Sequence, residues 1–318
     1  MNDHSIDGTR PNDTLRPAVL TTALLMLLVG SACSSVDQSK EPQAPLNLPE
    51  WVVYNGQNGQ TSSWKLLRDQ ALQSNIVLVG EEHTNPIAHQ LELKLVTDIF
   101  EHFPDTAVAM EMFERHEQAF VDLYLTDRIN SETLFETTDS KGWGGSLENW
   151  SNWYLPIVDA AKSNHNAGGD LIAANAPRSY VRLARLESHE ILKEIPTTAP
   201  QPFVVPDPEV DDSPYHERFV NLMTSYSSHT IDTDAYFRAQ QLWDATMAES
   251  VANATAEHSI VVLIAGDFHV ANKGGTTARI KHRLPGAKVI TISIVQKTDP
   301  AQFDSSDIGR ADFVVYTR

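Results

Sequence analysis

The chain has 318 residues, of which 41% are hydrophobic and 21% charged, a balance that excludes a disordered or collagen-like protein. Asp and Glu (42) outnumber Lys and Arg (24), and the formal net charge is -18. Affinity for nucleic acids comes largely from cationic contacts with phosphates, so we expect no nucleic-acid partner. The only cysteine, Cys33, excludes an intramolecular disulfide and a cysteine-rich metal site. Any metal must therefore be held by His, Asp, Glu or Tyr.

An apolar run over residues 18–30 lies near the N-terminus, after Arg10 and Arg16. It is too short to span a bilayer as a helix and has the length of the apolar region of a secretory signal. Small residues and then Cys33 follow it, and this pattern resembles a bacterial lipoprotein signal. We therefore expect a signal peptide over 1–32, acyl chains such as palmitate on Cys33, and a proline-containing tether over 33–50. The protein would then be lipid-anchored in the bacterial cell envelope, at the outer membrane. The alternative is a buried free cysteine after an ordinary apolar run.

Six short apolar runs are predicted strands. Most are apolar at every position, which is typical of strands buried on both faces. This predicts an α/β fold with a mainly parallel central sheet and helices on both faces. The runs span 76–79, 107–109, 171–174, 259–265, 288–295 and 313–316.

Three helices are well signalled. Asn85 and Pro86 suit the first positions of a helix whose apolar residues recur every four positions as far as Ile99. A second helix is predicted over 117–125 and a third from near Thr233. Six prolines between 196 and 214 exclude regular helix or central strand there. We therefore predict one domain over 51–318 with a Pro-rich insertion over about 196–232, helical again at 216–228, that packs over the sheet edge or covers a pocket.

Polar side chains follow four of the predicted strands. The carboxyl ends of parallel strands meet at one edge of a sheet, so we expect these side chains to share a crevice. The third helix should cover part of it with one face that carries Gln240, Asp244 and Met247. The strand-end residues are Glu81, His83, Glu111, Asn175, Arg178, Asp267 and His269.

Four of these side chains are of the types that bind metals or transfer protons: Glu81, His83, Glu111 and His269. Two carboxylates and two imidazoles can hold a divalent metal such as Mn, Co or Zn through mixed N/O ligands. They can equally form a general acid–base cluster without metal. His89 and Glu92, at i and i+3 on the following helix, are interpreted as a surface pair in preference to groups that orient this cluster.

Five segments, in order, resemble the ChaN family of haem-binding, iron-regulated lipoproteins in the Tiki/erythromycin-esterase-like superfamily. The resemblance spans roughly 64–295. Ala88 stands where the family often has the first His of a pair, Glu92 where it often has Gln, and the Arg usual before Pro156 is missing. The segments are GEEHTNPIAHQ (80–90), AMEMFER (109–115), AANAPR (173–178), AQQLWDATMA (239–248) and GDFHV (266–270).

The resemblance implies haem binding, with tyrosine as iron ligand and two haems stacked between two protomers, hence a homodimer. Tyr124 is the first candidate ligand and Tyr154 the second; a phenolate suits ferric haem. Met112 and Met247 are candidate contacts to the porphyrin face, and Arg178 is a candidate partner of a propionate. A membrane-tethered protein of haem or iron uptake follows, with an outer-membrane haem receptor as a further partner.

The same superfamily also contains enzymes. Its enzymatic branches use the Gly-Glu-x-His residues, here Glu81 and His83, together with a later Glu and His. The alternative function is therefore a metal-dependent hydrolase that uses these two residues with Glu111 and His269. Whether the protein is an enzyme stays open at this point.

Overall fold

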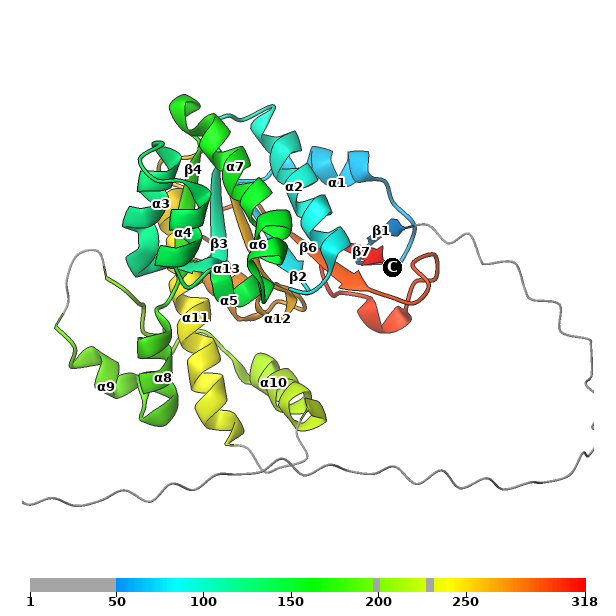
Figure 1. Cartoon of the computed structure of the whole chain (residues 1–318). Helices are drawn as coiled ribbons and strands as arrows, with labels where there is room; N and C mark the ends of the chain where they lie inside the picture. The colour runs from blue at the N-terminus through cyan, green and yellow to red at the C-terminus, as the bar shows by residue number, and fades with distance from the viewer. Residues whose placement is uncertain (1–49, 197–200, 227–231) are drawn as a thin grey trace, which may run out of the picture. The chain divides into compact units, whose positions relative to one another are not determined.

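The computed structural model describes residues 50–196, 201–226 and 232–318, and within them a seven-stranded sheet has the order β1-β7-β6-β2-β5-β3-β4 (Figure 1). Neighbouring strands are parallel, except that β1 pairs antiparallel with β7 at one edge. The predicted mainly parallel α/β sheet is confirmed. The strands are β1 (Trp51–Asn55), β2 (Ile76–Glu81), β3 (Ala107–Glu114), β4 (Asp170–Asn175), β5 (Val261–Gly266), β6 (Val289–Gln296) and β7 (Phe313–Thr317).

Helices cover both faces of the sheet, as predicted. Side chains of β2 alternate between two cores: Val77 packs with the helices that follow β2 and β3, and Leu78 packs with the last two long helices. The helices are α1 (Trp64–Ala71), α2 (Pro86–Phe100), α3 (Gln118–Leu125), α4 (Ser131–Thr137), α5 (Lys141–Gly144), α6 (Leu147–Trp153), α7 (Leu155–Asn164), α8 (Arg178–Leu186), α9 (His189–Lys193), α10 (Ser213–Tyr226), α11 (Thr233–Ala254), α12 (Asp267–Val270) and α13 (Gly275–Arg283).

The predicted helix starts agree with the caps. The Asn85 side chain accepts hydrogen bonds from the backbone N–H groups of Ile87 and Ala88, so α2 begins at Pro86. Asp232 caps α11 in the same way. These caps fix the first residue of α2 and of α11, and so determine which side chains of the two helices face the carboxyl ends of the strands.

The Pro-rich insertion packs on α11 and α12 near the carboxyl ends of the strands. Its helix α10 begins three residues earlier than predicted, at Ser213, because Pro214 is tolerated in a first helical turn. Tyr215 of α10 stacks on Phe268 of α12, with ring centroids 5.1 Å apart. The carboxylate of Asp212 pairs with the guanidinium of Arg279 on α13 and ties the insertion to the domain.

The predicted signal peptide, Cys33 and most of the tether lie outside the described residues. The described residues, from Glu50 onward, belong to one compact unit. Within its described part, none of the helices combines the length and the apolar character needed to cross a bilayer.

Candidate functional site

The ends of β2, β3 and β5 bring the four predicted carboxylate and imidazole groups together. These strands are neighbours in the sheet, so Glu81, Glu111 and the residues after Gly266 lie side by side. The Glu81 carboxylate accepts from His83 Nδ1 at 2.6 Å, and Glu111 Oε1 lies 3.4 Å from His269 Nε2. A Cβ at Gly266 would lie only 3.0 Å from His83 Nε2 and 3.5 Å from Glu111 Oε2. Glycine at this position therefore lets the His83 ring and the Glu111 carboxylate pack closely against the end of β5.

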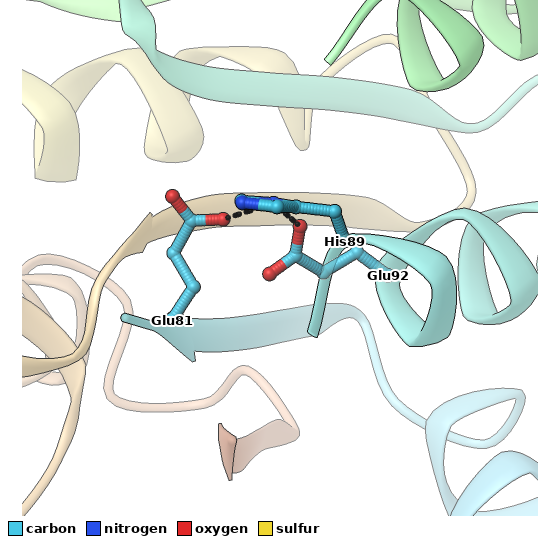
Figure 2. Close-up of side chains that lie close together, drawn as sticks. All are labelled: Glu81, His89 and Glu92. Carbon is cyan, nitrogen blue, oxygen red and sulfur yellow. Dashed lines mark hydrogen bonds and ion pairs between the residues drawn. The ribbon is translucent and has the colours of Figure 1, made fainter. Parts of the chain in front are cut away.

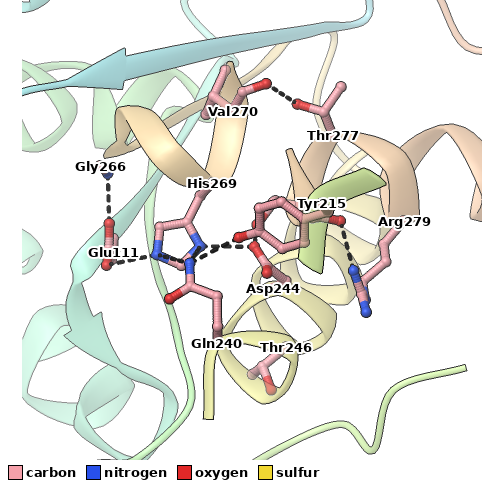
Figure 3. Close-up of polar contacts among 12 residues, drawn as sticks. Glu111, Tyr215, Gln240, Asp244, Thr246, Gly266, His269, Val270, Thr277 and Arg279 are labelled. Atoms are coloured by element: carbon pink, nitrogen blue, oxygen red, sulfur yellow. Dashed lines mark hydrogen bonds and ion pairs between the residues drawn. The ribbon is translucent and has the colours of Figure 1, made fainter. Parts of the chain in front are cut away.

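His269 is held between two buried carboxylates (Figure 3). Its Nδ1 lies 2.7 Å from Asp244 Oδ1, which also accepts from the Thr276 hydroxyl at 2.7 Å. Burial lowers the pKa of His269, but Glu111 and Asp244 raise it more, to about 10. The imidazole is then cationic at neutral pH and has no free lone pair with which to take a proton, so this geometry does not favour a general base.

One face of α11 points to this cluster, as predicted for two of its three residues. The Gln240 amide lies 3.1 Å from His269 Nδ1 and donates to the Tyr215 hydroxyl at 2.9 Å (Figure 3). Asp244 follows one turn later. Met247 instead packs in the core against the sheet, fully buried.

His89 and Glu92 form a buried group with Glu81, so the prediction of a surface pair was wrong. Their residues are only 2% and 0% exposed, because Trp153 stacks on the His89 ring and Tyr154 meets it edge-on. His89 Nδ1 lies 3.1 Å from Glu92 Oε2 and 3.2 Å from Glu81 Oε2 (Figure 2). The Tyr154 hydroxyl donates to Glu81 Oε1 at 2.9 Å.

The ionisation of this group follows from its burial. Burial lowers the pKa of His89, but the two carboxylates raise it more, to about 10. Burial and the neighbouring Glu81 together raise the pKa of Glu92 to about 8. For Glu81, burial raises the pKa, but hydrogen bonds from His83 and His89 outweigh it and hold the pKa well below its usual range.

Two further strand-end residues support the edge without joining the imidazole cluster. The Asn175 amide donates to the backbone carbonyl of Glu111 at 2.9 Å and fixes that strand end. Asp267 pairs with Arg310 and accepts from the Ser293 hydroxyl. Both residues therefore hold the strand ends in place and do not contribute to the cluster itself.

The tyrosines and methionines predicted to contact haem are buried. The Tyr124 hydroxyl donates to Asp159 at 2.5 Å, and this residue is 5% exposed. Burial raises the pKa of both Tyr124 and Tyr154. Met112 and Met247 are fully buried in the two cores. Their roles toward haem stay predictions.

A cavity of about 510 Å³ lies beside α11, where α8 and α10 flank that helix (Figure 1). It adjoins the strand-end cluster: the Trp143 ring contacts the His83 ring at 4.8 Å, and Gln240 reaches His269. Its lining is mostly apolar, with four basic or phenolic side chains among the apolar ones. The lining side chains are those of Trp143, Arg178, Val181, Arg182, Arg185, Phe219, Met223, Tyr236, Ala239, Gln240 and Trp243.

Of these lining residues, sequence reasoning had selected Arg178 and Gln240. Arg182 and Arg185 follow Arg178 at i+4 and i+7 and so lie on one face of α8. That spacing in the sequence could have predicted that the three arginines share a surface. No sequence pattern predicts the position of Tyr236, because its place beside α8 depends on tertiary packing.

Comparison with known proteins agrees with this fold. The family described as "Haem-binding uptake, Tiki superfamily, ChaN" matches residues 67–280. The structure titled "Cofacial heme binding to ChaN of Campylobacter jejuni" superposes with a TM-score of 0.58 at 15% identity, covering 84% of this chain and 97% of that one. The type III effector HopBA1 superposes with a TM-score of 0.45 at 13% identity, covering 79% and 91%. No curated protein matches the chain.

Proposed function

The chain belongs to the ChaN family of haem-binding uptake proteins in the Tiki superfamily, and we propose that it binds haem in the cavity beside α11. One observation carries this proposal: the cavity combines an apolar lining with three arginines and a tyrosine. Its volume of about 510 Å³ lies in the usual range for ligand pockets.

The lining fits the three chemical parts of haem. Aromatic and aliphatic side chains suit the macrocycle, whose faces are apolar. Guanidinium groups bind carboxylates through paired hydrogen bonds, so Arg178, Arg182 and Arg185 suit the propionates. A tyrosine oxygen is a known haem-iron ligand, as in catalase, and Tyr236 supplies one.

We propose Tyr236 as the iron ligand in preference to Tyr124. Tyr236 lines the cavity and is 36% exposed, and the Arg185 guanidinium lies 4.8 Å above its ring. Tyr124 is 5% exposed, and its hydroxyl is engaged by Asp159. Bound haem supplies an iron centre and a coloured, Soret-active group; the residues here bind it and orient it.

Haemin titration of the full chain tests this proposal. We expect Tyr236→Phe to weaken binding at least about tenfold, which corresponds to 1.4 kcal/mol, and to remove the phenolate-to-iron charge-transfer band. Tyr124→Phe is the matched control and should leave the affinity and the spectrum unchanged. The reverse result would assign the iron to Tyr124.

A second pair of variants tests the propionate contacts. Arg182→Ala should weaken haemin binding roughly tenfold, because a hydrogen bond to a charged group contributes about 1.5–3 kcal/mol. Arg128→Ala, which changes an exposed arginine just after the end of α3, should have no effect. Equal effects of the two variants would contradict a propionate site in this cavity.

We further propose that two copies pair across this cavity when haem binds. Cofacial haems require two sites that face one another, and exposed apolar side chains lie next to the cavity: Leu186 on α8 is 64% exposed. Sedimentation of the full chain should show a haemin-dependent dimer. A monomer at saturating haemin would contradict the pairing.

The proposal includes a role in haem uptake at the envelope. The apolar run before Cys33 supports a lipid anchor, and an outer-membrane haem receptor would then be the source or the acceptor of the haem. Intact mass of protein taken from membranes should show acyl chains on Cys33, and Cys33→Ser should release the protein from the membrane. The proposal does not extend to hydrolysis, because both ring nitrogens of His269 face carboxylates, Nδ1 at Asp244 and Nε2 at Glu111.

A further inference from the structure

Three buried side chains at the start of α2 and the end of β2 converge on one point: Glu81, His89 and Glu92. One ligand-type atom from each lies within 4.8 Å of the other two. All three residues are at most 2% exposed. The imidazole can balance at most one of the two carboxylates, and an unpaired buried carboxylate is costly.

The contacts of this group leave one buried oxygen without a partner. Glu81 Oε1 accepts from His83 Nδ1 and from the Tyr154 hydroxyl, and Glu81 Oε2 has only the 3.2 Å ion-pair contact with His89 Nδ1. Glu92 Oε2 faces His89 Nδ1, but Glu92 Oε1 has no hydrogen bond. Figure 2 shows this free oxygen of Glu92 on the side that faces Glu81.

The orientation of the His89 ring is the second observation that points to a ligand. Its Nε2 lies 3.2 Å from the backbone carbonyl of His83, which can only accept, so Nε2 carries the proton of this bond. Metal-binding histidines usually donate their other ring N–H to a carbonyl or carboxylate in this way. Nδ1 is then the atom directed at the two carboxylates. The stacked Trp153 ring, with its centroid 5.0 Å away, holds the imidazole in that orientation.

The separations are those of ligands that share one ion. His89 Nδ1 lies 3.2 Å from Glu81 Oε2 and 3.1 Å from Glu92 Oε2. Tetrahedral Zn²⁺ with bonds of about 2.0–2.2 Å places neighbouring ligand atoms roughly 3.3–3.6 Å apart. Small side-chain movements would therefore suffice to hold a cation.

We propose that Glu81, His89 and Glu92 bind one divalent transition-metal ion. Its two positive charges balance the two carboxylates, and it gives the unpartnered oxygen of Glu92 a ligand role. The mixed oxygen and imidazole donors suit Mn²⁺, Co²⁺ and Zn²⁺. The site shares Glu81 with the strand-end cluster and does not require haem.

Metal binding to the full chain, refolded with one equivalent of Co²⁺, Mn²⁺ or Zn²⁺, tests this proposal. We expect stoichiometric binding and a rise in melting temperature for the native sequence. Glu92→Gln keeps the shape of the side chain but removes its charge, and should weaken binding by at least about 100-fold, because losing a group that only supports a ligand already costs about 10–100-fold. Glu82→Gln, one residue after Glu81 and exposed, is the matched control and should bind like the native chain.

X-ray absorption of the Zn²⁺-loaded native chain keeps the proposal testable if Glu92→Gln does not fold. One imidazole and otherwise oxygen ligands at about 2.0–2.2 Å are expected. Two imidazoles would move the ion to His83 and His269 and overturn the proposal. The absence of stoichiometric binding would also overturn the proposal, and the two carboxyl groups would then be neutralised by protons. Equal weakening of binding by Glu92→Gln and Glu82→Gln would overturn it as well.

Discussion

Asp244→Asn should destabilise the protein by breaking the ion pair under the strand-end cluster. Asp244 Oδ1 lies 2.7 Å from His269 Nδ1, and the side chains are 0% and 8% exposed. Removing one partner of a buried pair costs about 3–5 kcal/mol. We expect about 3 kcal/mol, the lower end of that range, because Glu111 remains 3.4 Å from the imidazole and asparagine can still accept from Thr276. The melting temperature should fall by about 6–12 °C.

The pH dependence of this loss identifies its cause. The pKa of His269 is about 10 in the folded protein, against 6.5 for an ordinary histidine, since the two carboxylates outweigh the effect of burial. A raised pKa means that the pairing stabilises the fold fully below pH 6.5 and is lost as the pH rises through about 10. The difference between the native chain and Asp244→Asn should therefore be largest at pH 6 and should shrink toward pH 10.

Urea unfolding followed by tryptophan fluorescence at pH 6, 8 and 9.5 measures this difference. Asp234→Asn is the matched control on the same helix: Asp234 lies 2.9 Å from His216, but its side chain is 73% exposed. Such exposed pairs contribute about 0–1 kcal/mol. The reasoning is refuted if both variants lose the same stability, or if the loss from Asp244→Asn grows with pH.

Three further variants test the scaffold. Gly80→Ala would place a methyl group 2.7 Å from Asp267 Oδ1 and 2.9 Å from its Cα, so we expect about 1–3 kcal/mol of destabilisation in urea unfolding. Tyr154→Phe removes one donor to the carboxylate at the end of β2 and should cost about 1–3 kcal/mol in the same assay; no loss would mean that water replaces the hydroxyl. Asp212→Asn removes the charged partner of Arg279, and hydrogen exchange should become faster in residues 201–212 than in the native chain.

The parallel sheet could be predicted because its strands are buried on both faces and so are apolar at every position. The start of α2 could also be predicted, because Asn85 and Pro86 favour a helix start through local backbone geometry. β1 was not predicted: only Val53 and Tyr54 of its five residues are buried, and its partner strand lies more than 250 positions further along the chain. No local sequence pattern indicates that two segments so far apart in the chain pair with each other.

The burial of His89 and Glu92 could not be predicted for a related reason. Two polar residues at i and i+3 on a helix usually face water. Here Trp153, from a helix some sixty residues later, closes over them. The place of Tyr236 in the cavity depends in the same way on the packing of α8 against α11. Strand-end residues were predictable because the sheet itself brings them together; groups assembled by helix packing were not.

Gln240 belongs at once to the wall of the cavity and to the surroundings of His269. A ligand that moves this amide must change the free energy of the ion pairs behind it. Thermodynamic reciprocity then requires that any change in the charge of those groups alter the affinity of the cavity by the same factor. Helix α11 thus makes the occupancy of the cavity and the charge state of the ion pairs behind it coupled variables.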